Sequence, residues 1–127
     1  MTSAVLDSSA VLAVINDEPG ADTVIGILDD ALISTVNYAE VIAKLVERGS
    51  TSAQAQSALR SIALTTVDFD ITLAQRTGAL RAETMKRGLS LGDRACLALA
   101  EREGVPAMTG DRDWVGAVSG IGVRLIR

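Results

Sequence analysis

Four acidic residues of this 127-residue sequence stand among apolar neighbours: Asp7, Glu40, Asp93 and Asp111. Carboxylates brought together in a fold repel one another and their pKa values rise, a penalty that a divalent cation removes. An all-oxygen ligand set selects hard ions such as Mg²⁺ or Mn²⁺ over zinc. A metal held in this way lowers the pKa of a bound water and offsets charge on a phosphoryl oxygen, which suits hydrolysis of a phosphodiester.

The composition narrows the chemistry further because histidine is absent. This absence removes histidine-based cleavage of RNA, Ser-His-Asp and Cys-His triads, and zinc sites that need histidine. The net charge of -4 lacks the basic surplus of most nucleic-acid binders, and three aromatic residues are too few for a base-stacking platform. The acidic balance fits an ordinary surface, or acids around a metal that reverses the local charge on binding.

Strand and helix patterns alternate along the whole chain, which predicts a parallel sheet covered by helices on both faces. A first short strand is expected to end near Asp7. Four further strands are expected at Ala31–Ile33, Leu64–Phe69, Val105–Thr109 and Ile121–Ile126. The expected helices cover Ala10–Ile15 behind a serine cap, Ala21–Asp30, a helix capped by Ser34 or Thr35 that runs to Arg48, Ser52–Ala63, a long helix from its Asp70 cap to Gly88, and Ser90 to Gly104. The fold class is therefore a three-layer α/β/α sandwich with a mainly parallel sheet of four or five strands.

Such a sheet places the four acids at one rim, because ligands of open α/β sheets bind outside the carboxyl ends of the strands. Asp7 and Asp111 each follow a strand. Asp93 lies before a helix of about 11 residues that travels ~16 Å from the rim, and the next strand returns about as far. The side chain of Glu40 leans toward the start of its helix and so reaches back to the rim.

Each acid also has a purely local interpretation. Asp7 fits a helix cap, and Asp93 fits a favourable charge at a helix start. Asp111 fits a turn, and Glu40 fits a solvated helix position paired with Lys44. The spacing makes a shared metal site plausible, and it leaves these alternatives open.

Length and apolar content bound the organisation and the compartment. A chain of 127 residues with 48% hydrophobic residues fits one domain, here residues 1–127. The single cysteine, Cys96, excludes an intrachain disulfide and fits a reducing compartment; it lies in an apolar run and is expected in the core. We expect no membrane span and no signal peptide, and therefore a cytoplasmic location.

Four segments of the sequence resemble, in order, the acidic motifs of PIN-domain ribonucleases. They are Val5-Leu6-Asp7-Ser8-Ser9-Ala10, Ile33-Ser34-Thr35-Val36-Asn37-Tyr38-Ala39-Glu40, Leu89-Ser90-Leu91-Gly92-Asp93-Arg94-Ala95-Cys96-Leu97-Ala98-Leu99-Ala100, and Met108-Thr109-Gly110-Asp111-Arg112-Asp113-Trp114. Each motif is weak alone. Their order and spacing, from about residue 3 to residue 126, are similar to those of small VapC-type toxins of type II toxin–antitoxin modules.

The resemblance implies a magnesium-dependent endoribonuclease, with Mn²⁺ as a substitute, in which Asp7, Glu40, Asp93 and Asp111 are catalytic metal ligands. It makes Thr109 a polar neighbour that orients a carboxylate or a water, unless its hydroxyl simply bonds to backbone. Asp113 is an additional candidate ligand, and a turn role fits it equally well. Arg94 and Arg112 flank the metal acids, where they contact substrate phosphate, are solvated, or pair with nearby acids.

The resemblance also implies partners that composition and spacing do not reveal. They are an RNA substrate, a cognate antitoxin protein that blocks the site, and a second copy of the chain in a homodimer. Two other functions remain as alternatives. One is a non-catalytic PIN-like binding scaffold. The other is a receiver-type phospho-acceptor domain. The chain resembles receiver domains in size alone, since they need a lysine after a late strand and this chain has none there.

Overall fold

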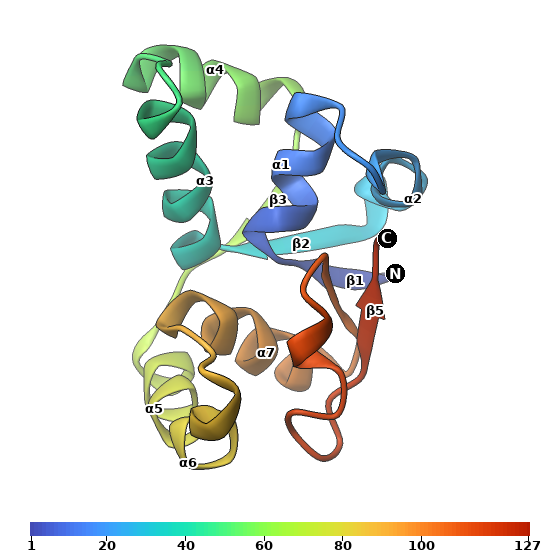
Figure 1. Ribbon diagram of the computed structural model, residues 1–127, viewed down its shortest axis with the longest axis vertical. Helices are drawn as coiled ribbons and strands as arrows, with labels where there is room; N and C mark the ends of the chain where they lie inside the picture. Colours follow the sequence, from blue (N-terminus) through green and yellow to red (C-terminus); the bar gives the residue numbers. More distant parts are fainter.

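The computed structural model describes all residues 1–127 and has a five-stranded parallel sheet at its centre (Figure 1). The strand order is β3-β2-β1-β4-β5. The strands are β1 (Ala4–Leu6), β2 (Ala31–Ser34), β3 (Thr65–Val67), β4 (Ala107–Thr109) and β5 (Val123–Leu125). The central strands β1 and β4 are wholly buried, as expected for a parallel sheet covered on both faces.

Helices cover both faces of this sheet, which gives three layers (Figure 1). One layer contains α1 (Ser8–Asn16), α2 (Ala21–Ile25), α3 (Thr35–Glu47) and α4 (Ser52–Ser61), and the other contains α5 (Ile71–Ala79), α6 (Arg81–Thr84) and α7 (Leu91–Glu103). Short 3-10 helices lie at Leu28–Asp30, Met85–Arg87 and Arg112–Trp114. Each layer packs its own apolar cluster on the sheet, with Leu6 and Ile33 on one side and Val5 and Leu99 on the other. The predicted α/β/α sandwich with a parallel sheet is confirmed.

The strand order also separates this fold from the receiver-type alternative. Doubly wound receiver domains have the order 2-1-3-4-5, in which the third strand lies beside the first. Here β1 lies between β2 and β4, and β3 forms the edge beside β2. The receiver alternative is therefore excluded by topology.

The predicted long helix from Asp70 to Gly88 is wrong, because the segment is divided into α5, α6 and a 3-10 turn at Met85–Arg87. Gly78 near the end of α5 has low helix propensity. The hydroxyl of Thr84 also donates to the Leu80 carbonyl at 2.9 Å, the kind of side-chain bond that bends helices. Interruption at Leu80 follows from these two features.

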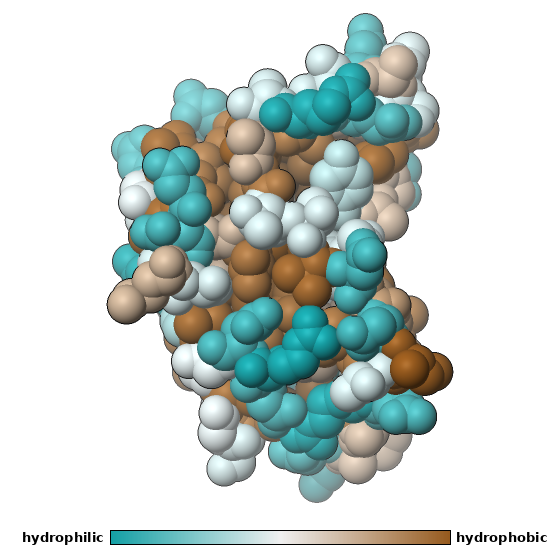
Figure 2. All heavy atoms as spheres, turned by 180° about the vertical axis from the view of Figure 1, so that it is seen from behind, coloured by the Kyte–Doolittle hydropathy of each residue, from teal (hydrophilic) through white to brown (hydrophobic).

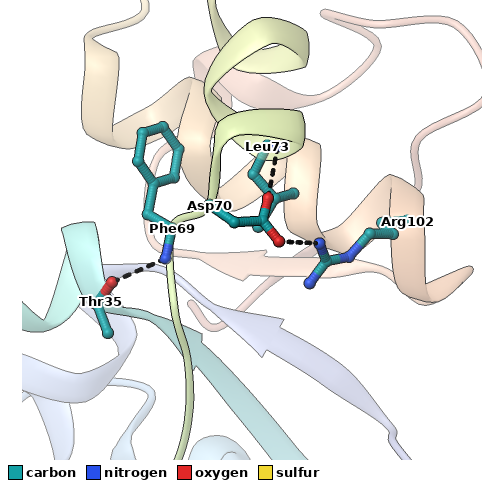
Figure 3. Close-up of polar contacts among 5 residues, drawn as sticks. All are labelled: Thr35, Phe69, Asp70, Leu73 and Arg102. Atoms are coloured by element: carbon teal, nitrogen blue, oxygen red, sulfur yellow. Dashed lines mark hydrogen bonds and ion pairs between the residues drawn. The ribbon is translucent and has the colours of Figure 1, made fainter.

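The start of α5 is capped by Asp70, as the sequence predicts, and the segment before it is bonded to the start of α3 (Figure 3). The Asp70 carboxylate accepts from the Leu73 N–H at 2.9 Å and pairs with Arg102 of α7 at 3.2 Å. Ser34 caps α3, and the Thr35 hydroxyl accepts from the Phe69 N–H at 3.1 Å. These contacts tie the link between β3 and α5 to both helical layers.

Seen from behind, the surface gathers apolar atoms at mid-height, between polar regions above and below (Figure 2). No helix has the length and apolar character required to span a bilayer.

Candidate active site

Asp7 immediately follows β1 and occupies the N-cap position of α1, yet its carboxylate makes no capping hydrogen bond. Its Oδ2 atom instead accepts from the hydroxyls of Ser9 at 2.8 Å and Thr109 at 2.9 Å. The residue is 5% exposed. The cap interpretation of Asp7, and the expected serine cap of this helix, therefore do not describe the structure.

The two hydroxyls beside Asp7 have fixed orientations because each also accepts a backbone hydrogen bond. Ser9 Oγ accepts from the Gly110 N–H at 3.0 Å, and Thr109 Oγ1 accepts from the Asp111 N–H at 3.1 Å. Each hydroxyl hydrogen is thus free to point at the Asp7 carboxylate. This network connects the end of β1 to the end of β4 and holds one oxygen of Asp7 in place.

Glu40 lies in the second turn of α3, and its side chain reaches back toward the rim. Asn37, one turn earlier, donates from Nδ2 to Glu40 Oε1 at 2.8 Å. No ion pair with Lys44 is formed within 4 Å. The partner that holds this carboxylate is an amide from within the fold, and the predicted alternative of a solvated pair with Lys44 is not observed.

Asp93 belongs to the first turn of α7, where it has a structural role as well as its place at the rim. Its Oδ2 accepts from the Ser90 N–H at 2.9 Å, and the Ser90 hydroxyl accepts from the Asp93 N–H at 3.2 Å, which completes a capping box. One of its carboxylate oxygens is engaged, and Oδ1 has no protein donor.

Electrostatics show that Asp7, Glu40 and Asp93 share one neighbourhood. Burial raises the pKa of Asp7; the hydroxyls of Ser9 and Thr109 oppose the rise, and the charge of Asp93 adds to it. Burial also raises the pKa of Glu40, where the Asn37 amide and the charge of Lys44 oppose the rise and the charges of Asp7 and Asp93 add to it. No Arg or Lys forms an ion pair with any of these acids. No basic side chain of the protein therefore pairs directly with this cluster.

Asp111 lies at the outer edge of this rim, and its carboxylate has a local partner. Its Oδ1 accepts from the Asp113 N–H at 2.9 Å and so caps the 3-10 helix Arg112–Trp114. Its own N–H bonds to Thr109, which links it to the network around Asp7. Asp111, Arg112 and Asp113 are all exposed. The structure brings Asp7, Glu40 and Asp93 into one neighbourhood and leaves Asp111 linked to them through the bond from its N–H to the Thr109 hydroxyl.

Arg94, expected as one of two phosphate contacts, turns away from the acids. Its side chain is buried between α5 and α7, and Nη1 donates to the Thr77 carbonyl at 3.0 Å. A residue that is 9% exposed and bonded to a helix backbone offers little to a substrate. The expectation that Arg94 contacts phosphate is therefore wrong, and Arg94 is a packing residue between two helices. Arg112 remains exposed at the rim.

The site lies on an open rim, and the two cavities of the protein lie elsewhere. One of about 260 Å³ is lined by Ala100, Glu101, Gly104, Val105, Pro106 and the loop at Gly120–Gly122, and one of about 540 Å³ by Asp17–Thr23, Ile126 and Arg127. The carboxylate donors suit a hard divalent ion. No three acidic side chains stand close enough to hold an ion directly as they lie here, so direct ligation by three of them requires side-chain movement.

Ser9, Asn37 and Gly92 belong to the site and were not identified from the sequence. Ser9 follows Asp7 by two positions, and Asn37 precedes Glu40 by three, one helical turn. Helical spacing was a signal for Asn37, since residues three apart share a face. Gly92 gave no signal, because what marks it is the close approach of the Glu40 carboxyl group, which comes from a different helix.

Comparison with known proteins identifies the family and the fold. The sequence model for the PIN domain matches residues 4–118. VapBC from Salmonella typhimurium, solved bound to DNA, contains a chain 20% identical, with both chains covered over 100% and a TM-score of 0.80. VapBC2 from Rickettsia felis, bound to a promoter DNA fragment, contains one 20% identical, with 98% of each chain covered and a TM-score of 0.76.

A third structure is VapC20 from Mycobacterium tuberculosis, described as a toxin that cleaves the sarcin-ricin loop. It is 18% identical over 91% of this chain and 95% of its own, with a TM-score of 0.76. At these identities the likeness demonstrates a common fold. No curated protein sequence matches this chain.

Proposed function

Because the chain belongs to the PIN domain family, we propose that it is a metal-dependent endoribonuclease that acts as the toxin of a toxin–antitoxin pair. On this proposal residues 1–127 form a single PIN domain. The observation that carries the nuclease assignment is the cluster of Asp7, Glu40 and Asp93. Burial and the charges of the neighbouring acids raise the pKa of Asp7 and Glu40, and none of the three acids has an ion-pair partner. Such perturbed clusters concentrate at functional sites.

The proposed ligands are Asp7, Glu40 and Asp93, with Asp111 completing the set from the outer rim. A Mg²⁺ or Mn²⁺ ion held by these residues would supply a water of lowered pKa and would offset phosphoryl charge. Ser9 and Thr109 fix one oxygen of Asp7 by donating to it. With no histidine in the sequence, the reaction uses carboxylates, and Asp113 remains an additional candidate ligand.

The substrate and partners follow from the same proposal. Arg112 is exposed beside Asp111 and has no ion pair, which suits contact with an RNA phosphate. Several chains of the same fold come from VapBC complexes, which supports a cognate antitoxin as partner. We propose a homodimer on family grounds, and the cytoplasm as the compartment because the one cysteine is free and buried.

The direct test is cleavage of total cellular RNA by the purified chain with added Mg²⁺ or Mn²⁺. We expect cleavage that EDTA abolishes and that excess Mn²⁺ restores. Cleavage that persists in EDTA would contradict metal dependence.

One observation favours a second function, a non-catalytic PIN-like scaffold. The acids at the rim do not by themselves form a three-ligand cage. If no RNA is cut with either ion while Mn²⁺ fails to bind in calorimetry, the scaffold becomes the better description of the protein.

A further inference from the structure

Asn37 is a fully buried polar side chain whose amide joins the two helical layers at the rim. Its Nδ2 donates to Glu40 Oε1 at 2.8 Å within α3 and to the Gly92 carbonyl of α7 at 3.0 Å. Figure 1 shows that these helices belong to opposite layers and approach each other where α7 begins. A single amide thus fixes the Glu40 carboxylate relative to the first turn of α7, which carries Asp93.

The orientation of this amide is determined by its partners. A carboxylate oxygen and a backbone carbonyl both accept, so the nitrogen of the Asn37 amide must face them. The oxygen Oδ1 is left buried with no donor, a costly arrangement for a polar atom. This unsatisfied oxygen lowers the stability of the fold, while the amide nitrogen holds Glu40 at a defined position.

Gly92 contacts the Glu40 carboxyl group from the side of α7. A Cβ atom added at Gly92 would overlap Oε1, Oε2 and Cδ of Glu40, so the carboxyl group lies directly on the glycine Cα. The backbone of Gly92 is helical and its φ is not positive, so its conformation does not require glycine. The need for glycine comes from the close approach of the acid.

We propose that Asn37 and Gly92 are positioning residues that seat the Glu40 carboxylate beside Asp7 and Asp93 for metal binding. The inference rests on the proposed function, since it assigns a purpose to the position of Glu40 at that same site. Neither residue touches substrate on this proposal. Both act through the single carboxylate between them.

The test uses the full chain and Mn²⁺ alone, with the dissociation constant measured by isothermal titration calorimetry. We expect Gly92→Ala and Asn37→Leu each to weaken Mn²⁺ binding by about tenfold or more, the usual effect of losing a group that orients a ligand. Gly78→Ala is the matched control, because Gly78 is also helical and an added Cβ there meets nothing within 4 Å. It should leave the Mn²⁺ affinity unchanged.

A double-mutant cycle separates the proposed contact from a general loss of fold. Glu40→Asp shortens the acid by one methylene and relieves the overlap with an alanine at position 92, so the combined variant should lose less affinity than the two single losses multiplied. In the metal-free protein, NMR should find the Asn37 side-chain amide protected from hydrogen exchange in the wild type and exposed in Gly92→Ala. Asn16 is the only other asparagine and serves as the exposed reference.

The outcomes are distinct. Wild-type affinity in both folded variants, or losses that multiply in the cycle, would overturn the positioning role and leave the nuclease proposal intact. Absence of Mn²⁺ binding by the wild type would overturn the metal site and this role together. We expect Gly92→Ala and Asn37→Leu to lose Mn²⁺ affinity and Gly78→Ala to keep it. We also expect the losses from Glu40→Asp and Gly92→Ala to combine to less than their product.

Discussion

Two groups of carboxylates in this protein have opposite environments. On the outer surface of α5 and α7, Asp70 pairs with Arg102, and Glu101 pairs with Arg76 through two bonds of 2.7 and 2.8 Å. Hydrogen bonds, from the Leu73 N–H and from Arg76 respectively, lower the pKa of these two acids. At the rim, burial raises the pKa of Asp7 and Glu40, and no cation is near enough to form a pair.

The contrast separates acids that stabilise the fold from acids whose burial destabilises it. A carboxylate with a lowered pKa favours the folded state at neutral pH, and one with a raised pKa disfavours it. Of the 12 Lys and Arg residues, Arg76 and Arg102 pair with acids on the α5 and α7 surface, and none forms an ion pair with an acid at the rim. Acids left unpaired at a cost in stability are typical of a site selected for chemistry.

The largest expected effect is on cleavage by Asp7→Asn compared with Asp70→Asn. We expect Asp7→Asn to reduce RNA cleavage with Mn²⁺ by more than about a hundredfold, because a neutral amide is a poor ligand for a hard ion and groups that merely orient a ligand already cost up to that much. Asp70→Asn removes the same charge on the paired surface and should cleave RNA as the wild type does. Rates at matched protein concentration test the difference.

Circular dichroism of both variants provides the control. Asp7 makes no capping bond, so its replacement should preserve α1, and asparagine at position 70 still caps α5. Equal cleavage by wild type and Asp7→Asn would remove Asp7 from the site and, with it, the functional side of the comparison.

The second effect is stabilisation of the folded chain by metal. Saturating Mn²⁺, at about 100 times its dissociation constant, should raise the free energy of unfolding by about 2.7 kcal/mol. The melting temperature in Mn²⁺ and in EDTA measures this gain. Asp7→Asn should show little of it and Asp70→Asn all of it. An identical shift in both variants would indicate that the ion binds away from the rim.

A smaller effect is expected when the paired surface is broken by Glu101→Gln. The pair with Arg76 is bidentate, but both side chains are more than a third exposed, at 39% for Arg76 and 34% for Glu101. Solvent screening limits such pairs, and we expect a loss of at most about 1 kcal/mol in urea unfolding. Cleavage should not change. A loss of activity in a variant that remains folded would connect the two groups of acids and weaken the comparison.

The sequence predicted the layers, the parallel sheet and the rim because these depend on periodic apolar patterns. Alternation of strand and helix is readable along the chain, and so is the placement of Asp7 and Glu40 after buried strands. The caps Ser34 and Asp70 were also predictable, since capping is decided within a few residues. These features are local or nearly so.

What the sequence did not reveal depends on contacts between distant segments. Arg94 points to Thr77 of α5, and Asn37 contacts Gly92 across 55 positions. The break at Leu80 depends on the low helix propensity of Gly78 and on the bond from the Thr84 hydroxyl to the Leu80 carbonyl. Side-chain direction at a helix start is decided by the neighbouring helix, which no single-segment pattern contains.

The smallest expected effect is the pH dependence of stability in the metal-free protein, measured by unfolding in EDTA. Because burial raises the pKa of Asp7 above its ordinary value of 3.8, its ionised form costs stability at neutral pH, and this cost disappears as the pH falls through the raised pKa toward 3.8. Asp7→Asn should therefore be more stable than wild type at pH 7, by a margin that shrinks on acidification. Asp70 has the opposite sign, since its lowered pKa contributes stability that is lost only as the pH falls below 3.8. The difference in stability between the wild type and Asp70→Asn should thus persist down to about pH 4 and vanish below it. Margins that change over the same pH range and with the same sign would show that the two acids share one environment.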